Sequence, residues 1–143
     1  MTPHQITLIR GSFEPLKPLA ATVAEAFYAQ LFARDPALRA LFRGGDMNEQ
    51  GARLMQMLSA AIDLLDRPAS LTPVLLKLGQ RHAGYGVVDA HYASVGAALL
   101  DTLSAGLGDA FTAEVREAWT AMYGHVAKTM QQGAATEAQV MAA

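Results

Sequence analysis

Cysteine is absent from this chain of 143 residues. Its absence excludes disulfide bonds, a catalytic thiol and metal sites built on thiolates. It also excludes covalent attachment of a prosthetic group through a pair of thiols, so any such group must be held by non-covalent contacts and side-chain ligands.

An excess of charge and a long apolar run are also missing. The chain has 11 Lys and Arg against 13 Asp and Glu, for a formal net charge of -2. This balance favours neither nucleic acid nor an anionic membrane as a partner. No apolar run is long enough to span a bilayer, and the first residues lack the basic start and apolar stretch of a signal peptide. We therefore expect a cytoplasmic protein with no membrane partner.

Strand-like alternation is absent as well, and helical periodicity is present nearly throughout. Apolar residues follow one another at helical spacing in the segment after Asp46, where they form one stripe: Leu54, Met57, Leu58, Ala61, Ile62 and Leu65. Hydrophobic residues make up 52% of the chain, enough for a substantial core in one domain. The pattern predicts an all-α domain over residues 1–132 and a frayed tail over residues 133–143.

Histidine is the residue type with the clearest potential for chemistry. The four histidines, His4, His82, His91 and His125, have no spacing typical of a zinc site. His82 ends a short helix that is predicted to begin at Thr72 and Pro73. From that position alone its ordinary role is to stabilise the helix C-terminus. A role as metal ligand is the less common alternative for a histidine so placed.

Four segments, in this order, carry a resemblance to a known family. They are FYAQLFARDPALRALF (27–42), QGARLMQML (50–58), LGQRHAGYGVVDAHYASVGAALL (78–100) and EAWTAMYG (117–124). Together they resemble the single-domain bacterial haemoglobins and the globin domains of flavohaemoglobins, the lineage of Vitreoscilla haemoglobin. The resemblance implies a globin fold of about seven to eight helices around a pocket for haem b, iron protoporphyrin IX.

The resemblance also implies roles for individual residues. His82 matches the iron ligand, Tyr28 the tyrosine on the opposite (distal) side, and Phe42 the phenylalanine that packs on the haem. Gln50 and Leu54 match the distal polar and aliphatic residues, and their spacing of four puts them on one helix face. Taken singly, each of these residues except His82 is more ordinary as a core or surface residue.

The remaining matches surround the histidine or the edge of the haem. Val87 matches an aliphatic residue at the haem edge, and Tyr92 matches a tyrosine beneath the histidine. Leu78 lies one turn before His82 on the same predicted helix. Arg53 and Arg81 match basic positions that meet the haem propionates, although each is otherwise an ordinary surface charge.

One family feature is missing at the expected position. In flavohaemoglobins a glutamate joins the tyrosine and the histidine and gives the imidazole more anionic character. The matching position here falls near Gly133 and Ala134, and Glu137 is out of register. This departure predicts a histidine suited to binding O2 more than to cleaving peroxide.

The function implied is reversible O2 binding, with Tyr28 and Gln50 as hydrogen-bond donors to the ligand. NO and CO are further expected ligands, and we expect a monomer or a weak homodimer. The alternatives are a nitric oxide dioxygenase, a gas sensor and a haem-free helical interaction module. Because the chain ends where a flavohaemoglobin continues into its reductase domain, the dioxygenase alternative requires a separate reductase.

Overall fold

The computed structural model describes residues 1–42 and 45–142, with side chains described up to Thr136. Within these ranges the chain forms α-helices and short 3-10 helices, and no strand. The α-helices are α1 (Pro3–Phe13), α2 (Ala20–Arg34), α3 (Met47–Asp63), α4 (Pro68–Gly84), α5 (Asp89–Leu107) and α6 (Ala113–Ala142). The 3-10 helices are η1 (Glu14–Leu19), η2 (Pro36–Phe42) and η3 (Gly108–Ala110).

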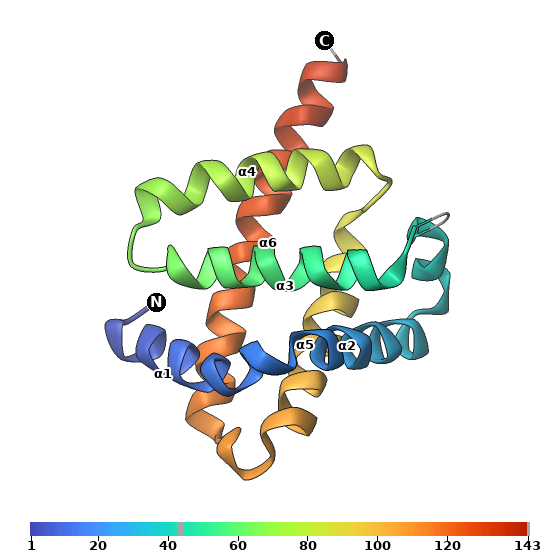
Figure 1. Ribbon diagram of the computed structural model, residues 1–143. Helices are drawn as coiled ribbons and strands as arrows, with labels where there is room; N and C mark the ends of the chain where they lie inside the picture. Colours follow the sequence, from blue (N-terminus) through green and yellow to red (C-terminus); the bar gives the residue numbers. More distant parts are fainter. Residues whose placement is uncertain (43–44, 143) are drawn as a thin grey trace.

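The helices form two crossing layers (Figure 1). Helices α1 to α4 lie on one side and cross α5 and α6, which lie behind them. Helix α4 packs on α6, α3 packs on α2, and α2 packs on α5. Although α3 and α4 are consecutive and antiparallel, they are not among the helix pairs of the described chain that approach closely. Each of the two is therefore held by a different neighbour.

The all-α prediction is confirmed, but the predicted number of helices is too high. Six α-helices are present in the described residues, where seven to eight were expected, because the segment Pro36–Phe42 is a 3-10 helix. Helix α4 begins at Pro68, whereas the sequence pattern predicts a start near Thr72. Pro73 lies inside α4 without ending it, because contacts with α6 compensate for the backbone hydrogen bond that proline cannot make.

Helix α6 extends beyond the predicted domain boundary at residue 132. Gly133 is buried in contact with α4, and the helix continues to Ala142. The side chains after Thr136 lie outside the described residues, so the frayed tail over 133–143 stays a prediction.

Local sequence signals explain how several helices begin and end. Thr2 accepts a hydrogen bond from the Gln5 amide at 3.1 Å and the Gln5 side chain accepts one from Thr2 in return, forming a capping box before Pro3. Asp46 caps α3 by accepting from the Asn48 amide. Arg10 of α1 donates to the Ile62 and Asp63 carbonyls, which places a cation at the C-terminus of α3.

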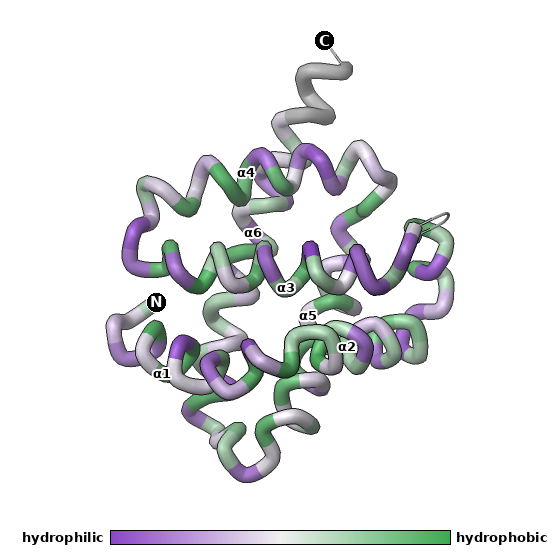
Figure 2. Tube along the Cα trace, in the orientation of Figure 1, coloured by the Kyte–Doolittle hydropathy of each residue, from purple (hydrophilic) through white to green (hydrophobic). Residues whose placement is uncertain are grey.

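The interior consists of two apolar clusters. The main core is centred on Trp119, which is fully buried and donates its indole N–H to the Ser12 hydroxyl at 2.8 Å. A second group, here called the aromatic cluster, joins α2, η2 and α5 through Phe27, Tyr28, Leu31, Leu38 and Ala98, with Phe32, Leu41, Phe42, Met47, Leu54, Val95 and Leu99 packed against them. Figure 2 shows hydrophilic and hydrophobic residues alternating along α3 and α4, as expected for amphipathic helices.

Helices α4 and α6 cross in backbone contact. A Cβ atom placed on Gly79 would lie 1.9 Å from the Met130 carbonyl oxygen, and one placed on Gly133 would lie 2.1 Å from the Leu76 carbonyl oxygen. Only glycine allows two helices to approach this closely. No helix in the described part of the chain is both long and apolar enough to cross a membrane.

We expect Gly79→Ala to destabilise the protein by about 1–3 kcal/mol or more, because the added methyl group meets backbone that cannot rotate away. Gly124→Ala is the matched control, since a Cβ there has nothing within 4 Å. It should raise stability by up to about 1 kcal/mol, the ordinary gain for alanine in a helix interior. Urea unfolding of both variants measures the difference. Equal stability of Gly79→Ala and the wild type would show that the crossing can relax.

Candidate functional site

His82 lies in the last turn of α4 and is half-buried. Its Nδ1 donates a hydrogen bond to the Leu78 carbonyl, four residues earlier, at 2.8 Å. Because that carbonyl only accepts, the bond places the proton of the neutral ring on Nδ1 and leaves the lone pair of Nε2 free. Burial lowers the pKa of His82 below its ordinary 6.5, the bond to Leu78 opposes this, and the charge of Arg81 lowers it further. The ring is therefore a neutral imidazole with an available ligand atom.

Two tyrosines of the main core, Tyr92 and Tyr123, have opposite hydrogen-bonding states. The Tyr123 hydroxyl of α6 donates to the Tyr92 carbonyl of α5 at 2.6 Å, and its ring packs where Gly96 leaves room for it. The Tyr92 hydroxyl is buried with no hydrogen-bond partner in the described structure. Burial raises the pKa of both hydroxyls; the charge of Asp89 adds to the rise for Tyr92, and Tyr92 adds to that for Tyr123.

No carboxylate partner for Tyr92 is present among the described side chains. Glu137, the nearest acid to the family's glutamate position, lies outside them. Val87 and Leu78 pack against the main core, which includes Tyr92, and the Val87 amide donates to the His82 carbonyl at 3.0 Å. The sequence-predicted residues on the histidine side are thus gathered at the end of α4 and the start of α5.

Tyr28 occupies the centre of the aromatic cluster. Its ring centroid lies 5.1 Å from that of Phe27, 5.9 Å from that of Phe32 and 5.4 Å from that of Phe42. The Phe27 and Phe42 rings meet the tyrosine edge-on, an arrangement favoured by the aromatic quadrupole. Leu54 of α3 packs against the same cluster. The tyrosine ring is therefore held on several sides by rigid side chains.

Gln50 and Arg53 lie at the start of α3, close to Tyr28. Helix α3 approaches α2 at Gly51, where a Cβ would lie 2.9 Å from that of Ala24, one turn before Tyr28. The Arg53 guanidinium donates to Gln50 Oε1 at 3.2 Å. Burial raises the pKa of the Tyr28 hydroxyl, while a hydrogen-bonding interaction with Gln50 and the charge of Arg53 oppose the rise. Both side chains therefore favour the ionised form of the tyrosine hydroxyl, against the effect of burial.

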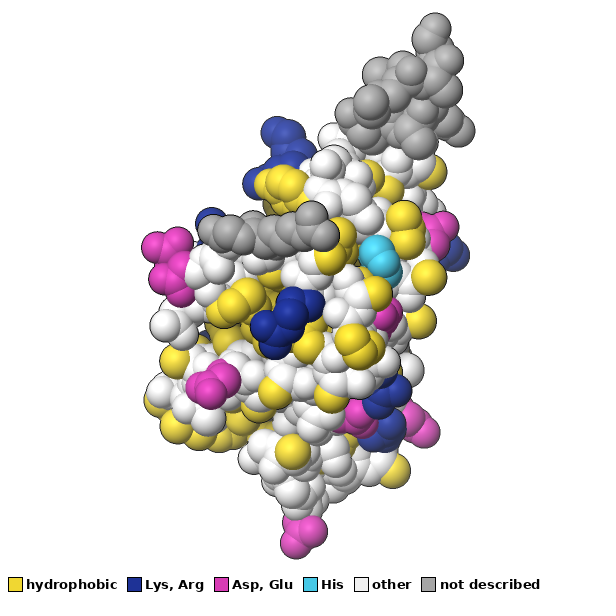
Figure 3. All heavy atoms as spheres, turned by 90° about the vertical axis from the view of Figure 1, so that its right-hand side faces the viewer, with side chains coloured by type: hydrophobic (Ala, Val, Ile, Leu, Met, Phe, Trp, Pro, Cys, Tyr) yellow, Lys and Arg dark blue, Asp and Glu magenta, His cyan; other side chains and the backbone are white. Residues whose placement is uncertain are grey.

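The two groups of residues lie toward the same side of the molecule. The chain enters α3 and leaves α4 at the right-hand side of Figure 1, and Leu99 packs on both the main core and the aromatic cluster. On that face, Figure 3 shows a hollow lined with hydrophobic side chains beneath one basic side chain. Arg81 is exposed, and within the described chain no hydrogen bond or ion pair holds its side chain.

Sequence reasoning did not single out Phe27, Phe32, Leu99 or Tyr123. A signal existed for Phe32, which lies four residues after Tyr28 and so on the same helix face. The contact of Tyr123 with Tyr92 joins residues 31 positions apart and follows from the packing of α6 on α5.

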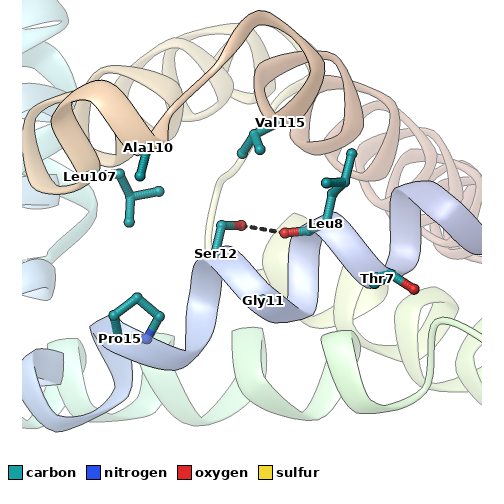
Figure 4. A pocket seen from close by; sticks show the side chains of 8 residues that line it. All are labelled: Thr7, Leu8, Gly11, Ser12, Pro15, Leu107, Ala110 and Val115. Atoms are coloured by element: carbon teal, nitrogen blue, oxygen red, sulfur yellow. Dashed lines mark hydrogen bonds between the residues drawn. The ribbon is translucent and has the colours of Figure 1, made fainter.

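A second hollow lies between α1 and the turn from α5 to α6 (Figure 4). Its lining is Thr7, Leu8, Gly11, Ser12, Pro15, Leu107, Ala110 and Val115, none of which has a titratable side chain. The one hydroxyl of structural consequence is that of Ser12, which donates to the Leu8 carbonyl at 2.7 Å and accepts from Trp119. This hollow offers no group for ligation or catalysis.

Comparison with known proteins identifies the family. Residues 25–130 match the family model for globins. The chain is a globin.

Relatives of two kinds resemble this globin. It is 34% identical over 134 residues to a flavohemoprotein of Xylella fastidiosa, covering 91% of this chain but 33% of the relative. It is 34% identical over 139 residues to a neuroglobin of Dissostichus mawsoni, covering 88% of this chain and 87% of the relative. A flavohemoprotein of Deinococcus radiodurans is 30% identical over 134 residues. The chain thus spans about a third of the flavohemoproteins and most of the neuroglobin.

Membership in the globin family implies haem binding and, with it, the binding of O2 and other gases. The residues of this globin fit such a group. His82 presents a neutral nitrogen whose tautomer is set by its other hydrogen bond, the usual arrangement for a metal-ligating histidine. The aromatic cluster and the hydrophobic hollow supply the apolar surface that a large flat ring requires.

Tyr92 and Tyr123 give a matched pair of substitutions that tests their two hydrogen-bonding states. We expect Tyr123→Phe to lower stability by about 0.5–1.5 kcal/mol, because it removes a buried hydrogen bond. Tyr92→Phe should cost nothing or stabilise the apoprotein, because it removes a buried hydroxyl that has no partner. Urea unfolding of the apoproteins compares the two. A loss for Tyr92→Phe as large as that for Tyr123→Phe would mean that the Tyr92 hydroxyl has a partner.

Proposed function

We propose that this globin binds haem b through His82 and binds O2 reversibly. The observation that carries the proposal is the 2.8 Å hydrogen bond from His82 Nδ1 to the Leu78 carbonyl, which leaves Nε2 as a free ligand atom. The depressed pKa of the half-buried ring keeps it neutral at pH 7, as ligation requires. Haem supplies the iron at which diatomic gases bind reversibly.

The other site residues hold the group and exclude water. Leu78 and Val87 on the histidine side, and Phe42 and Leu54 on the distal side, provide apolar walls for the ring. Arg81 is suited to a haem propionate because its guanidinium is exposed beside His82. Tyr92 and Tyr123 support the histidine side by filling the space between α5 and α6.

Tyr28 and Gln50 act on the gas ligand. O2 held at the haem iron would carry partial negative charge, so the Tyr28 hydroxyl and the Gln50 amide would hold it as hydrogen-bond donors more strongly than they would hold CO. The Tyr28 hydroxyl lies in a mostly apolar cage with Gln50 as its polar neighbour, where a donated hydrogen bond is strengthened by low dielectric. We therefore expect tight O2 binding and slow release.

The flavohemoprotein relatives favour a second candidate function with the same residues. This is the conversion of NO to nitrate by a nitric oxide dioxygenase, with electrons from a separate reductase. A stopped-flow assay of NO consumption by the O2-loaded protein, with and without a supplied flavin reductase, distinguishes the two. Sustained turnover favours the dioxygenase, and a single turnover favours the O2 carrier or store.

Purified wild-type protein should show a Soret absorbance band, and His82→Ala should lose it or bind haem far more weakly. His125→Ala is the control, because that histidine is exposed on α6 and far along the sequence from the site. Added imidazole should restore the band in His82→Gly by occupying the emptied ligand position. An unchanged ferrous spectrum in His82→Ala would exclude His82 as the ligand and overturn this part of the proposal.

Replacement of Tyr28 by Phe should raise the O2 dissociation rate by roughly 10-fold to 150-fold. That range corresponds to about 1.5–3 kcal/mol for a hydrogen bond to a partner that carries charge. Tyr85→Phe is the matched control, since Tyr85 is 68% exposed. Stopped-flow displacement of O2 by CO measures the rate. Equal rates for Tyr28→Phe and the wild type would rule out Tyr28 as a donor.

A further inference from the structure

Arg53 contacts the distal group in a way that its predicted role does not explain. From the sequence it is expected to meet a haem propionate, but its guanidinium donates to Gln50 Oε1 at 3.2 Å. The two residues are three positions apart on α3 and so lie on adjacent turns of one helix face. No ion pair with a carboxylate involves Arg53 in the described part of the chain.

The chemistry of arginine fixes which way the Gln50 amide is turned. A guanidinium has only donors, so the atom of Gln50 that faces it is the acceptor Oε1. The other end of the amide, Nε2 with its two N–H donors, then points away from Arg53.

The orientation of the amide decides what Tyr28 can do. A tyrosine hydroxyl has one proton and an oxygen that can accept. When Nε2 faces the tyrosine, the hydroxyl oxygen accepts from Gln50 and its proton stays available to a ligand. When Oε1 faces the tyrosine, the hydroxyl donates to Gln50 and its proton is no longer available. The reversed amide therefore removes the tyrosine donor without removing the tyrosine.

We propose that Arg53 is a positioning residue that fixes the Gln50 amide with Nε2 toward Tyr28, so that both side chains present hydrogen-bond donors and the site selects ligands that accept them, such as O2, over CO. This inference rests on the proposed function and adds a specificity-determining residue to it. Three features support the orientation: the Arg53 bond to Oε1, the close approach of α3 to α2 at Gly51, and the packing of Leu54, one turn after Gln50 on the same face of α3, against the aromatic cluster around Tyr28.

Three variants distinguish the effect of the Arg53 charge from the effect of its hydrogen bond to Gln50. Arg53→Met removes both donor and charge, and Arg53→Lys keeps the charge and one donor direction. Arg67→Met removes an equal charge just beyond the C-terminal end of α3, where the Arg67 guanidinium donates to the Asp63 carbonyl. Arg53 and Arg67 are both exposed, so each variant is expected to fold.

The first measurement is ¹⁵N NMR of the Gln50 side-chain amide, in the apoprotein and in the diamagnetic CO complex. Wild type and Arg67→Met should show a slowly exchanging, well separated pair of Nε2 protons. Arg53→Met should show fast exchange and shifts near those of a free glutamine, and Arg53→Lys should be intermediate. The CO stretching frequency, which reports distal polarity, should move for Arg53→Met and not for Arg67→Met.

The second measurement is gas release. Arg53→Met should raise the O2 dissociation rate by roughly three- to tenfold, the range for loss of one ordinary hydrogen bond, and leave the CO rate nearly unchanged. In the Tyr28→Phe background, Arg53→Met should change the O2 dissociation rate much less, because Arg53 affects O2 release through the Tyr28 hydroxyl.

Two outcomes overturn the inference while leaving the proposed function intact. The first is an unchanged Gln50 amide and CO frequency in Arg53→Met. The second is faster haem loss in Arg53→Met with an unchanged amide, which assigns Arg53 to a propionate. A wild-type protein without a Soret band would defeat the proposed function, and the NMR of the apoprotein would still measure the orientation of Gln50.

Discussion

The contact between the backbones of α4 and α6 at Gly79 is the constraint on which the candidate site depends. A side chain at this position would collide with the Met130 carbonyl. The two helices can therefore approach this closely only because Gly79 has no side chain. Helix α4 is therefore held by α6, while α3 is held by α2. Two consecutive antiparallel helices are in this way kept from packing on each other, and His82 is placed one turn beyond the crossing.

The two sides of the site are built by different physical means. On the histidine side the decisive contact is local, a side chain bonded to a carbonyl four residues earlier, and α4 carries both atoms. On the distal side Tyr28 is held by rings from α2 and η2, and its polar neighbours come from α3. The ligand atom is thus fixed by one helix, whereas the donors depend on the packing of three segments.

Much of the fold follows from local signals. The capping box at Thr2 and Gln5, the cap at Asp46 and the apolar stripe on α3 each concern residues within a few turns, and the structure contains the helices they predict. The sequence pattern is wrong where a contact between distant segments outweighs a local signal. Pro73 indicates a helix start near Thr72, yet α4 begins at Pro68 because its packing on α6 outweighs the hydrogen bond that Pro73 omits.

The helical class and the family resemblance follow from the sequence, which also nominates His82, Tyr28 and Gln50 as candidate site residues. The packing of the helices then sets the contacts around them. It left the Tyr92 hydroxyl without a partner among the described side chains and placed Tyr123 against the Tyr92 carbonyl. The physical reason is that helix periodicity and capping act over a few residues. The direction of a hydrogen bond at the site depends on atoms that separate helices bring together.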